Sequence, residues 1–263
     1  MGREAPRRGC AKMPLPHPEG STLETDAYRH LPRLRGRIAP AEASALRVTP
    51  EVIAQWDERA RQRGEGPDWR LSDAQLEATR VALLGGVEEL WVFGYGSLMW
   101  DPGFHFTEVR LAMLSGHRRR FTCRTTLGRG SPECPGLMLT LEPGDGDCAG
   151  LAFRVGAAQA AHESGMVWRR EMIRGIYRPC LLPLHTPQGE VRALVFAANL
   201  GHDDHVGELP LDETAAIIAR AAGVLGSNRQ YLEQLVWQLG HLGIVDRYLE
   251  QLLEHVRQRG AAR

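Results

Sequence analysis

The sequence predicts an α+β protein, because strand-like and helix-like segments gather in different parts of the chain. Short apolar runs typical of strands follow one another between residues 91 and 197, and turns rich in glycine and proline separate them. One helical pattern, residues 157–172, interrupts these runs, and three more follow after residue 211. Mostly adjacent strands with helices gathered late indicate an α+β fold rather than an alternating parallel one.

We divide the chain into three parts, with boundaries after residues 48 and 90. Residues 1–48 mix Pro, Arg, Gly and Ala with little apolar periodicity, which predicts a flexible N-terminal tail. Residues 49–90 predict a short helical extension. Thr49 is an expected N-cap followed by Pro50, and Ser72 stands three residues before Gln75 with capping-box spacing.

The third part, residues 91–263, is the predicted catalytic domain. It begins with the apolar run Trp91-Val92-Phe93, which leads into a turn with glycines at positions 94 and 96. We expect further strands at residues 111–114, 117–122, 137–141, 150–155, 177–184 and 191–197, and helices at residues 157–172, 212–222, 227–239 and 245–259.

The composition is that of a globular protein without a strongly charged partner. Of 263 residues, 43% are apolar and 24% are charged. Basic and acidic residues balance at 32 each, so no strong field favours nucleic acid or an anionic membrane. No apolar run approaches the roughly 20 residues that span a bilayer, and the first twenty residues lack the apolar segment of a secretory signal. We therefore expect neither a nucleic-acid nor a membrane partner.

The cysteines predict neither disulfides nor a zinc site. They number five, are widely scattered and form no Cys-x-x-Cys pair, which favours a reducing, cytoplasmic compartment. His202 and His205 have the spacing of metal ligands, but no partner cluster accompanies them in the sequence. We interpret that segment as a solvated loop and expect no metal site.

The segment Gly94-Tyr95-Gly96-Ser97-Leu98 is the sharpest local motif. Glycines allow a sharp turn and the close approach of a ligand to the main chain, and exposed N–H groups in such a turn suit an anion. A dinucleotide fingerprint would need a third glycine where Met99 stands, and a nucleophile elbow would need glycine in place of Tyr95. By residue types alone, a tight structural turn remains the simpler interpretation.

Glu171 is the candidate acid/base residue. On the predicted helix it shares a face with Val167 and Trp168, which lie four and three residues before it. Partial burial on that apolar face would raise its carboxyl pKa above the reference of about 4.3. A surface glutamate paired with a neighbouring arginine is the alternative, and taken alone it is the simpler one.

Four motifs in this order resemble the ChaC family of γ-glutamylcyclotransferases. They are residues 91–100, the Gly130-Ser131-Pro132-Glu133 segment, Arg169-Arg170-Glu171, and the Gly226-x-Asn228-x-x-Tyr231-Leu232 segment. The bacterial branch is especially similar, since Arg-Arg-Glu-Met-Ile precedes a Gly-x-Tyr strand there, as at residues 175–177 here. The resemblance covers about residues 91–257, and it implies a small, mostly antiparallel β-barrel flanked by helices.

The resemblance also implies roles for individual residues. Glu171 matches the catalytic glutamate of the family. The loop of residues 128–136 matches one that closes over the peptide part of the substrate. The implied substrate-binding residues are Tyr95, Gly96, Ser97 and Leu98, with Asn228 and Tyr231 as further candidates that line the pocket.

The implied activity is the cleavage of glutathione into 5-oxoproline and cysteinyl-glycine, without a metal or other cofactor. Leu98 after Tyr-Gly-Ser favours the glutathione-specific branch, by resemblance. Two alternatives stay open: action on other γ-glutamyl peptides or amines, and a non-catalytic γ-glutamyl-binding regulator. The sequence makes no prediction of oligomeric state.

Overall fold

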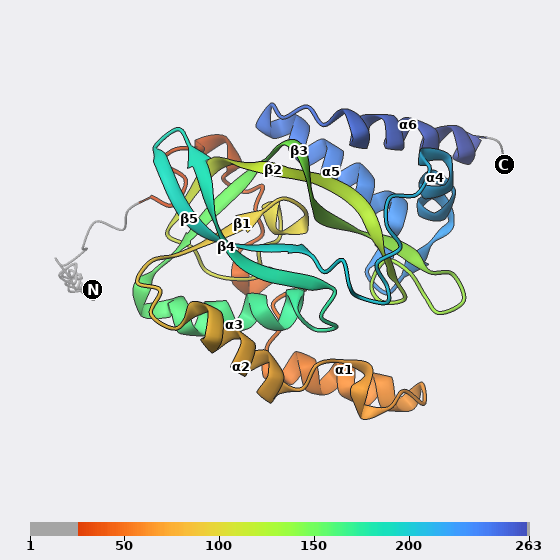
Figure 1. Ribbon diagram of the computed structural model, residues 1–263, viewed down its shortest axis with the longest axis horizontal. Coiled ribbons are helices and arrows are strands. Elements are labelled where there is room, and N and C mark those ends of the chain that lie inside the picture. Colours follow the sequence, from red (N-terminus) through yellow and green to blue (C-terminus); the bar gives the residue numbers. More distant parts are fainter. Residues whose placement is uncertain (1–25, 262–263) are drawn as a thin grey trace, which may run out of the picture.

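The computed structural model describes residues 26–261 and contains a closed five-stranded barrel with helices on two sides (Figure 1). The order of strands around the barrel is β1-β3-β2-β4-β5, and β1 pairs with β5 to close it. That closing pair is parallel and the others are antiparallel, which confirms the predicted α+β class and the mostly antiparallel barrel. The strands are β1 (Leu90–Gly94), β2 (Glu108–Thr125), β3 (Gly136–Val155), β4 (Tyr177–Thr186) and β5 (Gly189–Ala198).

Two of these strands are longer than we expected. β2 joins the expected strands 111–114 and 117–122, and β3 joins 137–141 and 150–155. The break that we expected at Gly116 is a shift in register inside a long hairpin, between the pairs Ser115↔Asp147 and His117↔Pro143. Gly116 has φ +71° and Gly146, in the segment opposite, has φ +104°. Paired strands absorb such glycines as bulges, so turn-forming residues did not end the strands here.

The two helices with predicted capping residues, α1 and α2, begin where those residues indicated. The side chain of Thr49 accepts a hydrogen bond from the Val52 N–H, and Ser72 with Gln75 forms the full capping box. Ser227 and Gln230 form a second capping box at the start of α5. The helices are α1 (Pro50–Gln62), α2 (Asp73–Leu84), α3 (Ala160–Glu171), α4 (Leu211–Arg220), α5 (Asn228–Leu242) and α6 (Arg247–Ala261), and a short hairpin of β6 (Ala222–Gly223) and β7 (Gly226–Ser227) precedes α5.

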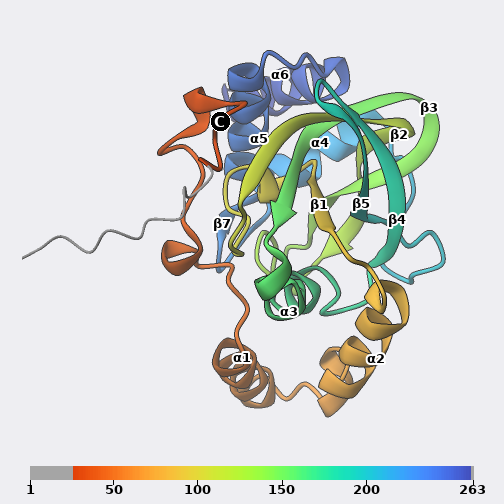
Figure 2. The same cartoon turned by 90° about the vertical axis from the view of Figure 1, so that its left-hand side faces the viewer.

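The helices lie in two groups on opposite sides of the barrel. In both ribbon views α5 and α6 lie together on one side, and α3 lies on the other with α2 and α1 beyond it (Figure 1, Figure 2). None of the helices in the described residues is long and apolar enough to cross a membrane.

The N-terminal part differs from the expected flexible tail of residues 1–48. Residues 26–48 pack against the domain: the side chains of Leu34 and Val48 are 0% exposed, and Ile38 is 4% exposed. The Ala39 N–H donates to the Trp100 carbonyl, 2.8 Å away, just beyond the glycine loop. The apolar residues that anchor this segment are scattered and show no periodicity, so the sequence did not indicate that the segment packs against the domain. The remainder of the expected tail, residues 1–25, lies outside the described residues.

The N-terminal extension, by which we mean residues 26–90, also holds helix α3 near both of its ends. Arg47 donates two hydrogen bonds to the carboxylate of Glu163, at 2.7 and 3.0 Å, in the first turn of α3. Near the other end, the indole N–H of Trp168 donates to Thr79 Oγ1, 3.1 Å away in α2. These contacts fix the helix that carries Glu171.

We predict that Arg47→Ala destabilises the fold by about 3 kcal/mol, because it leaves the Glu163 carboxylate, which is 2% exposed, with His105 as its remaining cationic partner. Urea unfolding followed by tryptophan fluorescence measures the loss. The matched control is Arg61→Ala, which breaks an exposed pair with Glu58 in α1 and is expected to cost about 0.5 kcal/mol or less. Equal losses in the two variants would contradict the proposed bracing of α3.

Candidate active site

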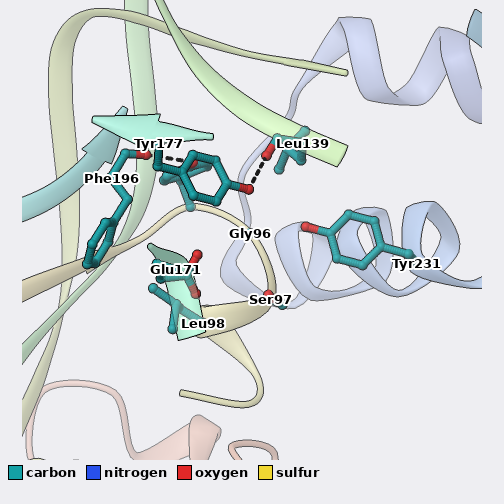
Figure 3. Close-up of a pocket in the computed structure, with 9 residues that line it drawn as sticks. Gly96, Ser97, Leu98, Leu139, Glu171, Tyr177, Phe196 and Tyr231 are labelled. Atoms are coloured by element: carbon teal, nitrogen blue, oxygen red, sulfur yellow. Dashed lines mark hydrogen bonds between the residues drawn. The ribbon is translucent and has the colours of Figure 1, made fainter. Parts of the chain in front are cut away.

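The glycine loop, the end of α3 and the start of α5 meet at a small pocket (Figure 3). Main-chain and side-chain groups from β3, β4 and β5 complete its wall. The pocket brings together most of the predicted site residues from distant parts of the sequence. Its lining consists of Tyr95, Gly96, Ser97, Leu98, Leu139, Glu171, Tyr177, Phe196 and Tyr231.

Gly96 is required at the floor of the pocket because a neighbouring side chain comes very close to it. A Cβ atom at this position would lie 2.9 Å from the Tyr231 hydroxyl and 3.3 Å from Leu139. No hydrogen bond within the described residues engages the N–H groups of Gly96 and Leu98. The loop therefore offers free main-chain donors beside a position without a side chain, which suits a polar or anionic ligand.

Side chains from other elements hold the glycine loop in place. Arg119 Nε donates to the Tyr95 carbonyl at 2.7 Å, and Gln238 Nε2 donates to the Met99 carbonyl at 3.1 Å. Arg119 is buried, whereas its neighbours Arg118 and Arg120 point outwards and pair with Glu208. This alternation is the one that a strand imposes, and it turns one arginine of the run towards the site.

Glu171 is the last residue of α3, and its side chain, 14% exposed, points into the pocket. Burial raises the pKa of its carboxyl above the ordinary value, and the positive charge of Arg170, with Nε 3.0 Å from Oε1, partly opposes the shift. The sequence-based expectation of a partly desolvated glutamate is thus met in the structure. Its acid/base role remains a proposal.

Arg170 joins the helix to the glycine loop, a function that the sequence did not reveal. Its Nη2 donates to Ser97 Oγ at 2.8 Å, and its Nη1 donates to the Asp101 carbonyl at 2.6 Å. From the sequence alone, we could identify Arg170 only as a possible partner of Glu171. The network explains why the two residues are adjacent: one side chain provides the carboxylate, and the other holds the loop against it.

Tyrosine hydroxyls surround the carboxylate. The Tyr95 hydroxyl donates to the Phe196 carbonyl at 2.8 Å and the Tyr177 hydroxyl to the Leu139 carbonyl at 3.0 Å, whereas the Tyr231 hydroxyl points into the pocket (Figure 3). Burial raises the pKa of Tyr231 to about 12, so this phenol stays protonated near neutral pH. Tyr177 was not among the predicted site residues, although the Gly175-Ile176-Tyr177 strand start marked its position.

Asn228 does not line the pocket, contrary to our prediction. Its side chain is 0% exposed and satisfies both main-chain groups of Leu137: the amide oxygen accepts from the N–H at 2.7 Å, and the amide nitrogen donates to the carbonyl at 2.9 Å. Asn228 therefore fixes the start of α5 to β3. Sequence spacing could not separate this structural role from ligand binding, because both require a buried amide near Tyr231.

The other candidates remain outside the pocket. His205 Nε2 lies 3.0 Å from Glu142 Oε1, and His202 lies 2.9 Å from the Arg174 carbonyl. Among the described residues no group of three or more His, Cys, Asp or Glu side chains is placed to hold a metal ion. The Cys180 thiol contacts the Val195 carbonyl.

Comparisons with known proteins agree with this geometry. A family model described as ChaC-like protein matches residues 90–259. The chain is 40% identical over 170 residues to a glutathione-specific γ-glutamylcyclotransferase of Escherichia coli, covering 64% of this chain and 73% of the relative. A protein of Danio rerio named glutathione-specific γ-glutamylcyclotransferase 1 is 34% identical, with 58% and 80% covered. The crystal structure of a yeast γ-glutamylcyclotransferase specific to glutathione superposes with a TM-score of 0.61 at 26% identity, covering 65% of this chain and 96% of that one.

We predict that Glu171→Gln stabilises the protein at pH 7 to 8. A carboxyl whose pKa is raised in the folded state contributes stability at low pH that is lost as the pH rises through that raised value. Glutamine does not titrate, so the variant does not lose this stability as the pH rises. The difference in stability between the variant and the wild type should therefore shrink as the pH falls towards the unfolded-state pKa of about 4.3. Each tenfold difference in proton affinity between the folded and unfolded carboxyl is worth about 1.4 kcal/mol.

Thermal unfolding of both proteins between pH 4 and 8 measures this difference. Glu58→Gln, at an exposed position of α1, controls for the loss of one negative charge. A variant that is less stable than the wild type at neutral pH and equal to it in acid would contradict the burial argument.

Proposed function

The chain belongs to the ChaC-like family, and on that premise we propose that it is a γ-glutamylcyclotransferase that cleaves glutathione into 5-oxoproline and cysteinyl-glycine. The observation that carries the proposal is the position of Glu171, a partly buried carboxylate that faces an open loop of main-chain donors across a small pocket.

The proposed reaction depends mainly on how the substrate is oriented. The α-amino nitrogen of the γ-glutamyl unit attacks its own γ-carbonyl carbon, a new C–N bond closes the five-membered lactam, and the C–N bond to cysteine breaks. A well-oriented intramolecular attack corresponds to effective molarities of about 10⁵–10⁸ M. The protein must fold the substrate back on itself and move protons from the attacking ammonium nitrogen, which keeps one N–H in the lactam, to the leaving amide nitrogen, which leaves as an ammonium group.

Glu171 is suited to carry these protons. A carboxyl with a raised pKa can accept a proton from the attacking ammonium group and return it to the leaving amine. Arg170 opposes the shift, because its positive charge favours the ionised, proton-accepting form of Glu171. Arg170 also holds Ser97, and with it the loop that carries the substrate.

The glycine loop binds the γ-glutamyl unit. The free N–H groups of Gly96 and Leu98 can hold a carboxylate or the developing oxyanion of the γ-carbonyl. The missing side chain at Gly96 leaves room for the Tyr231 hydroxyl, which packs against the loop. This hydroxyl stays protonated and provides a neutral donor beside the loop.

We expect the purified protein to convert reduced glutathione into equal amounts of 5-oxoproline and cysteinyl-glycine. Glu171→Gln should lower the turnover by about 10²–10⁴-fold while it still binds glutathione, because loss of one acid/base group removes proton transfer and not binding. Chromatographic assay of both products and calorimetric binding test the two expectations.

Two results would refute parts of the proposal. Normal turnover by Glu171→Gln would remove Glu171 from the mechanism. Binding of glutathione by the wild type without any product, and with γ-glutamyl-alanine also left intact, would indicate a binding protein in place of an enzyme.

The acidic limb of the pH profile of kcat/KM should show the effect of the Arg170 charge on the pKa of Glu171. Because the positive charge of Arg170 lowers the pKa of Glu171, Arg170→Gln should raise it and move the acidic limb of kcat/KM to higher pH. Ser97→Ala removes the hydroxyl that Arg170 holds but keeps the charge beside Glu171, so it should lower kcat/KM without moving the limb. An unmoved limb in Arg170→Gln would exclude this electrostatic role.

A further inference from the structure

Arg129 is an arginine near the pocket without an anionic partner. It lies in the loop between β2 and β3, and its guanidinium carbon is 5.7 Å from the centre of the Tyr231 ring. Within residues 26–259 its side chain makes one hydrogen bond, from Nη1 to the Ser227 carbonyl at 3.4 Å, and no ion pair. A guanidinium carries five N–H donors, so most of its binding capacity is open.

The environment makes an unpaired guanidinium costly at this position. The side chain is half-buried, and burial lowers the pKa of Arg129 while no carboxylate opposes the shift. A partly desolvated cation without a counter-ion is unfavourable unless a ligand supplies the missing negative charge. Two other arginines that touch pocket-lining residues differ in this respect, since Arg119 and Arg170 each donate to main-chain carbonyls and lie beside a carboxylate.

Backbone contacts hold the loop that carries Arg129. The Leu225 N–H donates to the Gly128 carbonyl at 2.9 Å, so the turn between β6 and β7 is attached to the loop. A Cβ atom on Gly130 would lie 2.3 Å from the Thr125 carbonyl, and one on Gly223 would lie 2.4 Å from the Gly128 carbonyl. Such close packing fixes the backbone that carries Arg129 before any ligand arrives, which lowers the entropic cost of ordering the loop on binding.

Tyr231 connects this guanidinium to the catalytic pocket. Its hydroxyl lines the pocket and packs against Gly96, and its ring contacts Arg129. With the γ-glutamyl unit placed against the glycine loop and Glu171, the two remaining residues of the tripeptide reach about 7 Å further when extended.

We propose that Arg129 binds the glycine carboxylate of glutathione and so selects the tripeptide over γ-glutamyl compounds that lack this carboxylate. The inference rests on the proposed cyclotransferase function and adds a specificity residue to it. A guanidinium binds a carboxylate through two parallel charge-assisted hydrogen bonds. The α-carboxylate of the γ-glutamyl unit is left to the main-chain donors of the glycine loop.

The test compares glutathione with its glycine ethyl ester, which keeps the γ-glutamyl unit and lacks the terminal charge. For the wild type we expect kcat/KM to be about 10- to 100-fold lower with the ester, the loss typical of a charge-assisted contact. Arg129→Gln should lower kcat/KM for glutathione to about the level of the ester, mainly through KM, and leave the ester unchanged. Arg129→Lys should recover part of the preference.

Arg124→Gln is the matched control. This arginine lies in the same hairpin, is 52% exposed and pairs with Asp204, so both substrates should keep their wild-type rates. Equal losses for acid and ester in Arg129→Gln would overturn the inference, and so would a wild type that does not distinguish the two substrates.

Binding measurements separate this inference from the proposed function. Calorimetric titration of Glu171→Gln, with and without Arg129→Gln, uses the same acid and ester and needs no turnover. A preference for the acid that disappears with Arg129 supports the inference even if the wild type forms no product, in which case the proposed activity fails instead. Equal preferences in the two proteins overturn the inference.

Discussion

The site depends on one arrangement, a carboxylate and a guanidinium side by side at the buried end of α3. Burial and the negative end of the helix dipole both favour a neutral Glu171, whereas Arg170 favours the ionised form. These opposing effects act on one carboxyl at the edge of the pocket. The same Arg170 holds Ser97, so the group that favours the ionised carboxylate also holds the glycine loop beside it.

The rest of the fold holds the two sides of this arrangement in position. The loop follows β1, whose five residues are all buried, and Arg119 and Gln238 hold its main chain. On the other side, α3 is held by Arg47 and Thr79 of the N-terminal extension. The family match begins at residue 90, so this second support comes from outside the matched segment. An extension that carries no pocket residue can therefore influence the site through α3.

Local chemistry explains what the sequence could and could not predict. Helix starts at Thr49 and Ser72 were predictable because a cap and its partner lie within three residues. The long hairpin was not, because Gly116 suits a strand end as well as a bulge and only the partner strand decides. Likewise, motif order placed Glu171, Gly96 and Tyr231 in one pocket, but the amide of Asn228 and the guanidinium of Arg170 could be assigned only once their long-range partners were known.

In an intramolecular reaction of this kind, the leaving part of the substrate is the part that differs between substrates. Selectivity therefore depends on the residues that bind the leaving group. Any γ-glutamyl amine can close the same lactam, and in the proposed mechanism Glu171 acts on atoms that all these compounds share. A distinction between them can arise beyond Tyr231, where Arg129 offers an open cation. Among the described residues no ion pair or hydrogen bond joins Arg129 to Glu171, and they lie on different elements. In the proposed mechanism, changes in the loop between β2 and β3 would therefore alter the substrate range without touching the proton transfer assigned to Glu171.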